Sequence, residues 1–222
     1  MRYYSKKVYI SEAFYSMFSS PQSYKEYVEE FVDAYYQYVD GFDSTMQFIY
    51  KGHIESVFNE NVMFYDELKD IIYENNELKL FDENVYSIIR SFNDKFRNYM
   101  EHLYEDMEQN RLYIESIDIP FIKNLSLLNK HDANLKVNYQ KPFLEIVFDG
   151  GYCGIEMLCF ELTKDLDFKF LEEYTVIFEE IYQISEDIFE YNILLWGTSD
   201  LVYEGVREVT IEFKGGSSYK IQ

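Results

Sequence analysis

The sequence predicts an α+β fold, with about five helices in a helical region at residues 1–130 and an antiparallel β-meander of about six strands at residues 131–222. Apolar residues recur with the helical period of 3.6 before His131 and with the strand period of 2 after it. Short links join the predicted strands, and consecutive strands with short links pair antiparallel. We expect the two regions to pack as one unit.

The helical region contains five segments with the spacing of amphipathic helices. They cover residues 21–41, 45–58, 62–74, 83–112 and 120–128. Asp82 has the position of a cap for the long fourth helix, and Pro120 suits the first turn of the fifth. The first helix carries a stripe that we interpret as core: Tyr24, Val28, Phe31, Tyr35, Tyr38 and Phe42.

The β region contains six segments in which apolar and polar residues alternate. They cover residues 135–139, 144–148, 155–162, 174–184, 188–196 and 207–213. Asp149-Gly150-Gly151 is a turn signal after the second strand, and its glycines suit backbone conformations with positive φ. Residues 185–187 are expected to join the fourth and fifth strands in a tight hairpin.

The charge of the chain limits its partners. Asp and Glu number 41 against 20 Lys and Arg, which gives a formal net charge of −21. The excess is spread over both halves of the chain, so it belongs to a folded surface and not to an acidic tail. Direct nucleic-acid binding needs clustered Lys and Arg and is not expected, unless the protein imitates nucleic acid. A basic protein is the expected partner.

The cysteines and the N-terminus indicate a cytoplasmic protein. Cys153 and Cys159 are separated by five residues, which fits neither the usual zinc spacing nor a redox motif, so we expect free thiols. The first residues lack the apolar core of a signal peptide, and no apolar run is long enough to span a membrane. We expect no membrane association, no metal and no cofactor, and the sequence does not predict the oligomeric state.

Two groups of residues are candidates for chemistry. His131 and Asp132 have the order found in metal-dependent HD phosphohydrolases, but only His53 and His102 remain as further histidines. We therefore favour a structural role for His131-Asp132 between the last helix and the first strand.

Glu179 and Glu180 lie in the predicted fourth strand, so one carboxylate points to each face of the sheet. A carboxylate on a buried face is suited to general acid or base work, with Asp149 as a companion. If the protein is an enzyme, the residues concerned are therefore His131, Asp132, Asp149 and Glu180. No nucleophile motif and no phosphate-binding loop accompanies them.

Several short motifs resemble those of an uncharacterised family from low-GC Gram-positive bacteria, catalogued as a domain of unknown function. They are the opening Met1–Lys6, His131-Asp132, Phe148–Gly151, Phe178–Tyr182 and the hairpin ending in Tyr191–Leu195. Trp196 and residues 197–206 depart from the family pattern. The resemblance implies the architecture and carries over no catalytic residue.

The function that the sequence favours is that of an acidic interaction protein. It would bind or inhibit a basic protein, in the manner of immunity proteins or phage inhibitors of host defence, because an acidic surface steers a basic partner. The alternatives are a carboxylate- or metal-dependent hydrolase and a structural domain without a specific ligand. The residues expected to bind are Glu161, Asp165, Asp167, Glu172, Glu173, Glu179, Glu180, Glu186, Asp187, Glu190 and Tyr36.

Overall fold

The computed structural model describes residues 2–19, 23–27, 58, 61–74, 77–78, 82–127, 130–151, 154–166, 174–197 and 206–220. Outside the described residues lie most of the predicted helices at 21–41 and 45–58, and also Tyr36, His53, Cys153, Asp167, Glu172 and Glu173. The chain forms two compact units, a helical unit of residues 6–102 and a barrel unit of residues 1–5 and 103–222. That the helical and β regions pack as one unit stays a prediction.

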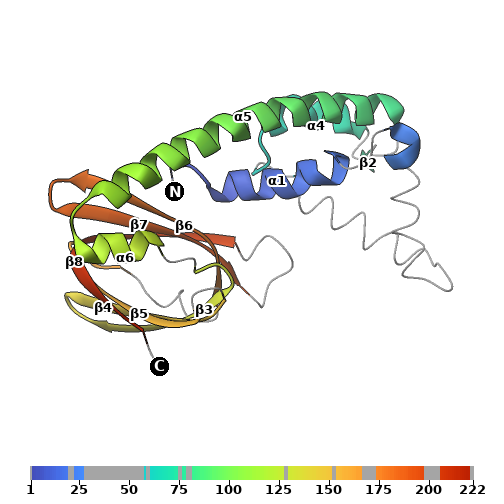
Figure 1. The fold of residues 1–222 in the computed structure, drawn as a ribbon. Helices are drawn as coiled ribbons and strands as arrows, with labels where there is room; N and C mark the ends of the chain where they lie inside the picture. The colour runs from blue at the N-terminus through green and yellow to red at the C-terminus, as the bar shows by residue number, and fades with distance from the viewer. Residues whose placement is uncertain are drawn as a thin grey trace. The chain divides into compact units, whose positions relative to one another are not determined.

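The helical unit follows the first five residues of the chain (Figure 1). It contains α1 (Lys6–Ser19), a helical segment at residues 24–27, α4 (Tyr65–Ile72), a ribbon of β1 (Tyr73–Glu74) and β2 (Glu77–Leu78), and the first part of α5 (Glu83–Ser116). The second part of α5 belongs to the barrel unit. In the described part of the chain, no helix is both long and apolar enough to cross a membrane.

Helix α1 is one that the sequence patterns did not predict. Its buried face includes Phe14 and Phe18, but Ser11 interrupts the apolar stripe. The Ser11 hydroxyl donates to the Lys7 carbonyl oxygen at 2.6 Å and accepts the backbone N–H of Met63 at 2.7 Å. A serine with both hydrogen bonds made can be buried at little cost. The helix therefore has a packed face without a continuous apolar pattern.

Helix α4 is shorter than the predicted helix at residues 62–74. Phe64, just before it, has a left-handed backbone conformation with φ of 62°, which a helix cannot continue through. Tyr73, just after it, is extended and opens β1. The helix is thus confined between two residues with non-helical backbones.

Helix α5 begins as its cap predicts. Asp82 Oδ1 accepts the backbone N–H of Asn84 at 2.8 Å and that of Val85 at 3.2 Å, so the predicted cap is confirmed. The helix continues four residues beyond the predicted end at residue 112. Helix α6 (Pro120–Leu127) begins at the proline, as predicted.

Aromatic rings form much of the core of the helical unit. The Tyr15 and Phe96 centroids are 4.9 Å apart, and those of Tyr27 and Tyr86 are 4.7 Å apart. The Tyr15 hydroxyl donates to the Met63 carbonyl oxygen at 2.8 Å, which satisfies the polar end of a buried ring. Burial raises the pKa of Tyr15, so this hydroxyl stays a neutral donor.

Six strands of the barrel unit close into an antiparallel barrel (Figure 1). They are β3 (Ala133–Gln140), β4 (Phe143–Gly150), β5 (Gly154–Leu162), β6 (Tyr174–Ser185), β7 (Ile188–Gly197) and β8 (Val206–Lys220). The order around the barrel is β3-β4-β5-β8-β7-β6. The predicted α+β class with six antiparallel strands is confirmed. The meander takes the form of two three-stranded meanders, joined through β5 with β8 and through β6 with β3.

Helix α6 packs into the core of the barrel unit. The Phe121 ring contacts the ring of Phe160 edge-on, with centroids 5.5 Å apart, and that of Phe213 at 5.8 Å. Gly216 on β8 faces the Phe121 ring, and a Cβ at this position would lie 2.5 Å from Phe121 Cε1 and 2.4 Å from the Cys159 carbonyl oxygen. The helix can approach the sheet this closely only because position 216 has no side chain.

The turn after β4 has the glycine conformations that its sequence predicts. Gly150 and Gly151 have φ of 91° and 61°. A Cβ at Gly151 would lie 2.3 Å from the His131 carbonyl oxygen. The turn is therefore held against the residues that precede β3.

We expect Gly216→Ala to lower the free energy of unfolding by about 1–3 kcal/mol, because the methyl group must displace the Phe121 ring or the sheet backbone. Urea unfolding followed by circular dichroism measures this change. The matched control is Gly215→Ala, where the nearest atom, Glu161 Oε2, is 4.0 Å from the new Cβ. Equal stability of the two variants would show that the contact between α6 and β8 is not this tight.

Candidate functional site

The barrel has one short seam, between β3 and β6. Within the described residues these strands share a single aligned pair, Asn134 with Thr175. Beyond that pair, side chains of α5 serve the β6 edge: Asn110 Nδ2 donates to the Ile181 carbonyl oxygen at 2.9 Å, and the Tyr113 hydroxyl hydrogen-bonds the side chain of Gln183. Helix side chains thus replace a strand at this edge.

A pocket of about 260 Å³ lies at this edge of β6, entirely within the barrel unit. Strand β6 contributes residues 178–181, and α6 contributes Leu125 and Ser126. The N-terminal segment contributes Tyr3, and α5 contributes side chains between residues 104 and 114. Most of the lining is apolar or aromatic, and the polar part is dominated by carboxylates.

Glu179 is the carboxylate on the inner face of β6. Its Oε2 lies 2.7 Å from Lys130 Nζ and accepts a hydrogen bond from the Tyr191 hydroxyl, and its Oε1 accepts the Lys130 backbone N–H at 3.1 Å. Lys130 is fully buried, with Nζ also donating to the Leu125 carbonyl oxygen at 3.3 Å and lying 5.7 Å from the Phe148 ring centroid. The buried ammonium is thus surrounded by acceptors and rings that replace its water.

Glu180 is the carboxylate on the outer face, as strand alternation predicts. Its Oε1 accepts the backbone N–H of Tyr4 at 2.6 Å, and its Oε2 accepts that of Arg2 at 3.2 Å and the Tyr182 hydroxyl. Burial, followed by the hydrogen bond to Glu180, raises the pKa of Tyr182, which keeps this hydroxyl protonated as a donor. The side chain of Glu180 therefore anchors the N-terminal segment.

Two of the motifs that carry the resemblance, Met1–Lys6 and His131-Asp132, contact β6. The Tyr4 ring stacks near that of Phe178, with centroids 4.6 Å apart. The backbone N–H of Asp132 donates to the Val176 carbonyl oxygen at 2.9 Å. Lys130, next to His131, reaches Glu179. These two motifs therefore share a structural role, which is to fix the position of β6.

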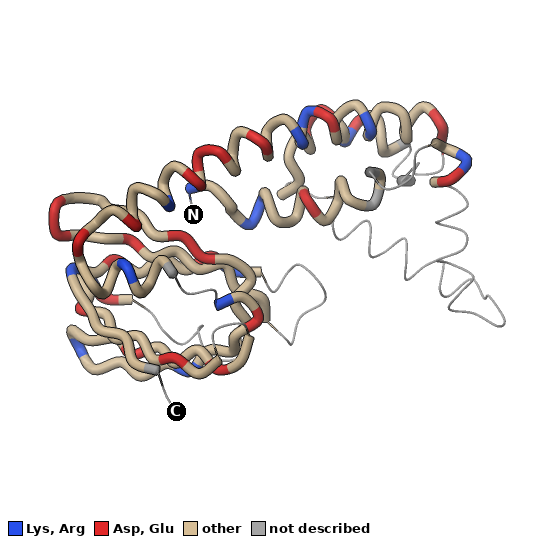
Figure 2. The backbone as a smooth tube through the Cα atoms, in the orientation of Figure 1, with Lys and Arg blue, Asp and Glu red and all other residues tan. Residues whose placement is uncertain are grey.

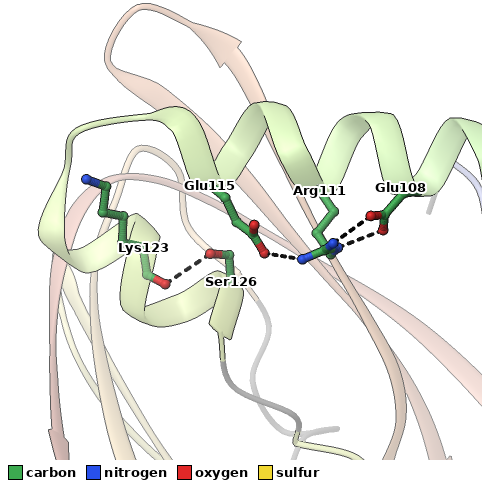
Figure 3. Close-up of polar contacts among 5 residues, drawn as sticks. All are labelled: Glu108, Arg111, Glu115, Lys123 and Ser126. Atoms are coloured by element: carbon green, nitrogen blue, oxygen red, sulfur yellow. Dashed lines mark hydrogen bonds and ion pairs between the residues drawn. The ribbon is translucent and has the colours of Figure 1, made fainter.

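Arg111 forms a fixed cluster at the pocket wall (Figure 3). Its Nε and Nη2 donate to the two carboxylate oxygens of Glu108 at 2.7 and 2.6 Å, and its Nη1 donates to Glu115. The spacing of these residues places all three on one helix face. The Ser126 hydroxyl, on α6, donates to the Lys123 carbonyl oxygen at 3.0 Å (Figure 3).

The four residues considered for catalysis are not gathered in the pocket, which includes only Glu180. His131 Nδ1 and Asp132 Oδ2 are 3.0 Å apart in an exposed turn before β3. Asp149 pairs with Lys136 at 2.8 Å and aligns through β3 with Thr175. Glu180 lies five residues beyond Thr175 on β6, which corresponds to about 16 Å along an extended strand. Among the described residues, no group of three or more His, Cys, Asp or Glu could hold a metal ion.

The acidic residues expected to bind a partner are distributed over several parts of the barrel unit. Glu161 pairs with Lys214 at 2.8 Å, and Asp165 pairs with Lys141 at 2.5 Å. Asn192 Nδ2 donates to Glu190 at 2.8 Å, whereas Glu186 and Asp187 are exposed in the turn between β6 and β7. Figure 2 shows Asp and Glu at positions along α5 and around the barrel.

Three parts of the site were missed from the sequence: Lys130, the N-terminal segment and the end of α5. Lys130 and Glu179 are 49 residues apart, and Tyr4 and Glu180 are 176 residues apart, so no local pattern connects them. A signal was available only for Arg111, whose i−3 and i+4 neighbours on α5 are both glutamates.

We expect Lys130→Met to lower the free energy of unfolding by about 3–5 kcal/mol, because it leaves Glu179 without its buried cation. The double variant Lys130→Met/Glu179→Gln should recover about half or more of that loss, since the amide oxygen can still accept from Tyr191. Denaturant unfolding of both variants measures the difference. If the double variant is no more stable than the single one, the charge of Glu179 is not the cause.

We expect Glu180→Gln to increase hydrogen exchange of the Tyr4 backbone amide about tenfold, because the amide group offers fewer acceptor sites than the carboxylate. Exchange measured by NMR tests this. Glu186→Gln, at an exposed position of the neighbouring turn, is the matched control and should leave the Tyr4 amide unchanged. Unchanged exchange in both variants would contradict the role of Glu180 as an anchor.

Comparisons of the chain with family models, curated proteins and solved structures find no match in any of the three. The resemblance to the Gram-positive family therefore stays a prediction, and the function must be inferred from the geometry of the described residues.

Proposed function

We propose that this protein is a cytoplasmic, non-catalytic acidic protein that binds a basic protein partner, as an inhibitor or immunity protein does. The observation that carries the proposal is how the chain uses its cations. Nine lysines and arginines of the described residues form ion pairs with the protein's own carboxylates. Because acids outnumber bases by 21, the surface that remains is strongly negative.

The state of the paired acids supports the same proposal. The hydrogen bond from Lys141 is the main cause that lowers the pKa of Asp165, and the one from Lys164 lowers that of Glu212. Both pairs are therefore ion pairs at neutral pH, and the negative field around the barrel comes from the acids in excess of such pairs. Such a field speeds association with a basic surface and repels phosphate-rich ones.

A carboxylate-dependent hydrolase is less well supported by the geometry. Glu179 is ion-paired with Lys130, and Glu180 already accepts three hydrogen bonds that anchor the N-terminal segment. His131 pairs with the Asp132 carboxylate, and Asp149 pairs with the Lys136 ammonium. These contacts give each residue a structural role and bring no two of them to a common substrate position.

We expect affinity capture from lysate of the native host to retain a partner rich in Lys and Arg, identified by mass spectrometry. The dissociation constant of that purified partner should rise at least about tenfold between about 50 and 500 mM salt, because screening removes the attraction. A partner whose affinity is independent of salt, or no retained partner at all, would contradict the proposal.

The exposed turn between β6 and β7 allows a test of where the partner binds. Glu186→Gln/Asp187→Asn removes two predicted binding charges, and Asp70→Asn/Glu83→Gln makes the same change of charge in the helical unit. We expect the first variant to slow association more than the second. Equal association rates would show that this turn does not face the partner.

A further inference from the structure

The pocket beside β6 combines the two kinds of group that recognise an organic cation. Tyr3, Tyr104 and Phe178 supply aromatic rings, whose faces attract positive charge. Three glutamates are among the lining residues, Glu108, Glu179 and Glu180, against one arginine. The lining therefore favours a positive group over a neutral or negative one.

Arg111 does not reverse this preference. Two carboxylates hold its guanidinium, Glu108 through a bidentate pair and Glu115 through Nη1 (Figure 3). The cluster as a whole is negative, because it has two anions for one cation. An anionic ligand that approached Arg111 would be repelled by both of these carboxylates.

The carboxylates still have room for a donor. An ionised carboxylate has about four lone-pair sites. Glu179 and Glu180 each accept three structural hydrogen bonds, two at Oε2 and one at Oε1. Each Oε1 therefore has one acceptor site left, and because the two side chains lie on opposite faces of β6, a single donor group can use only one of these sites.

The same part of the barrel unit already binds cations of its own in this way. The Arg2 guanidinium lies 4.4 Å from the centroid of the Tyr182 ring, beside Glu180. Lys130 Nζ lies 5.6 Å from the Tyr191 centroid while it pairs with Glu179. In both cases an aromatic ring and a neighbouring carboxylate together bind the positive charge.

We propose that the pocket receives one arginine side chain of the basic protein partner, with the guanidinium between the Tyr104 ring and one carboxylate of β6. A volume of about 260 Å³ suits a single side chain better than a larger ligand. Arginine fits better than lysine because its planar group can stack on a ring and donate to several oxygens at once. This inference rests on the proposed function, since it assigns a specific contact to the same partner.

The first test titrates the full chain with N-acetyl-arginine methylamide, which carries one guanidinium and no other charge. We expect it to shift the NMR signals of the Met107, Ile114 and Ile181 methyl groups, which line the pocket. The citrulline analogue has nearly the same shape without the charge and should bind at least about fivefold more weakly. Equal binding of both probes, or no shift of these methyl groups at up to about 50 mM probe, would overturn the proposal.

The second test uses a pair of tyrosine substitutions. Tyr104→Leu removes a pocket ring at a residue that is 49% exposed, so the fold should tolerate it. Tyr219→Leu makes the same change on β8, at a residue that is 53% exposed and does not line the pocket. We expect the first to weaken probe binding about threefold and the second to leave it unchanged. Equal effects of the two would overturn the proposal.

The two proposals fail differently. If a basic partner binds with the expected salt dependence but Tyr104→Leu binds it like the unsubstituted protein, the arginine pocket is wrong and the proposed function stands. If the probe binds in the pocket but no basic protein is captured, the proposed function fails and the pocket remains a site for guanidinium groups.

Discussion

The barrel unit depends on the way its shortest seam is closed. Strands β3 and β6 share one aligned pair among the described residues, yet an antiparallel barrel needs the polar groups of every strand edge to be satisfied. The end of α5 supplies Asn110 and Tyr113, and the residue before the β3 turn supplies Lys130. A row of side chains cannot follow a strand edge as continuously as another strand does. The pocket is the space that this substitution leaves.

Glu179, which is partly buried, and Glu180, which is buried, show how two adjacent acids can be tolerated. Strand geometry sends them to opposite faces, where one is compensated by a buried ammonium and the other by backbone N–H groups and a phenol. Each solution ties β6 to a distant segment, Lys130 in one case and Tyr4 in the other. The acids therefore contribute to the specificity of the fold as well as to its charge.

Local patterns in the sequence predict the elements but not their partners. Periodicity and caps gave α5, α6 and the six barrel strands, because each of these has a regular apolar pattern and an unambiguous start. Helix α1 was missed because a hydrogen-bonded Ser11 occupies its buried face, and β1 and β2 are too short for any alternation. The alternation of strands carries no information on which edges meet, so the pairing of β5 with β8 and the pocket could not be predicted.

In the proposed recognition, the surface charge affects the rate of encounter and the pocket determines selectivity. A field from many ionised carboxylates attracts any basic surface, so it can raise the rate of encounter without selecting one partner. A pocket that accepts a single planar cation between a ring and a fixed carboxylate adds the selection, because a misplaced or neutral side chain leaves that acceptor unsatisfied. The fixed partners of Glu179 and Glu180 hold the acceptors in place before binding. Preorganisation of this kind lowers the entropy that binding costs, which allows a small pocket to contribute to affinity.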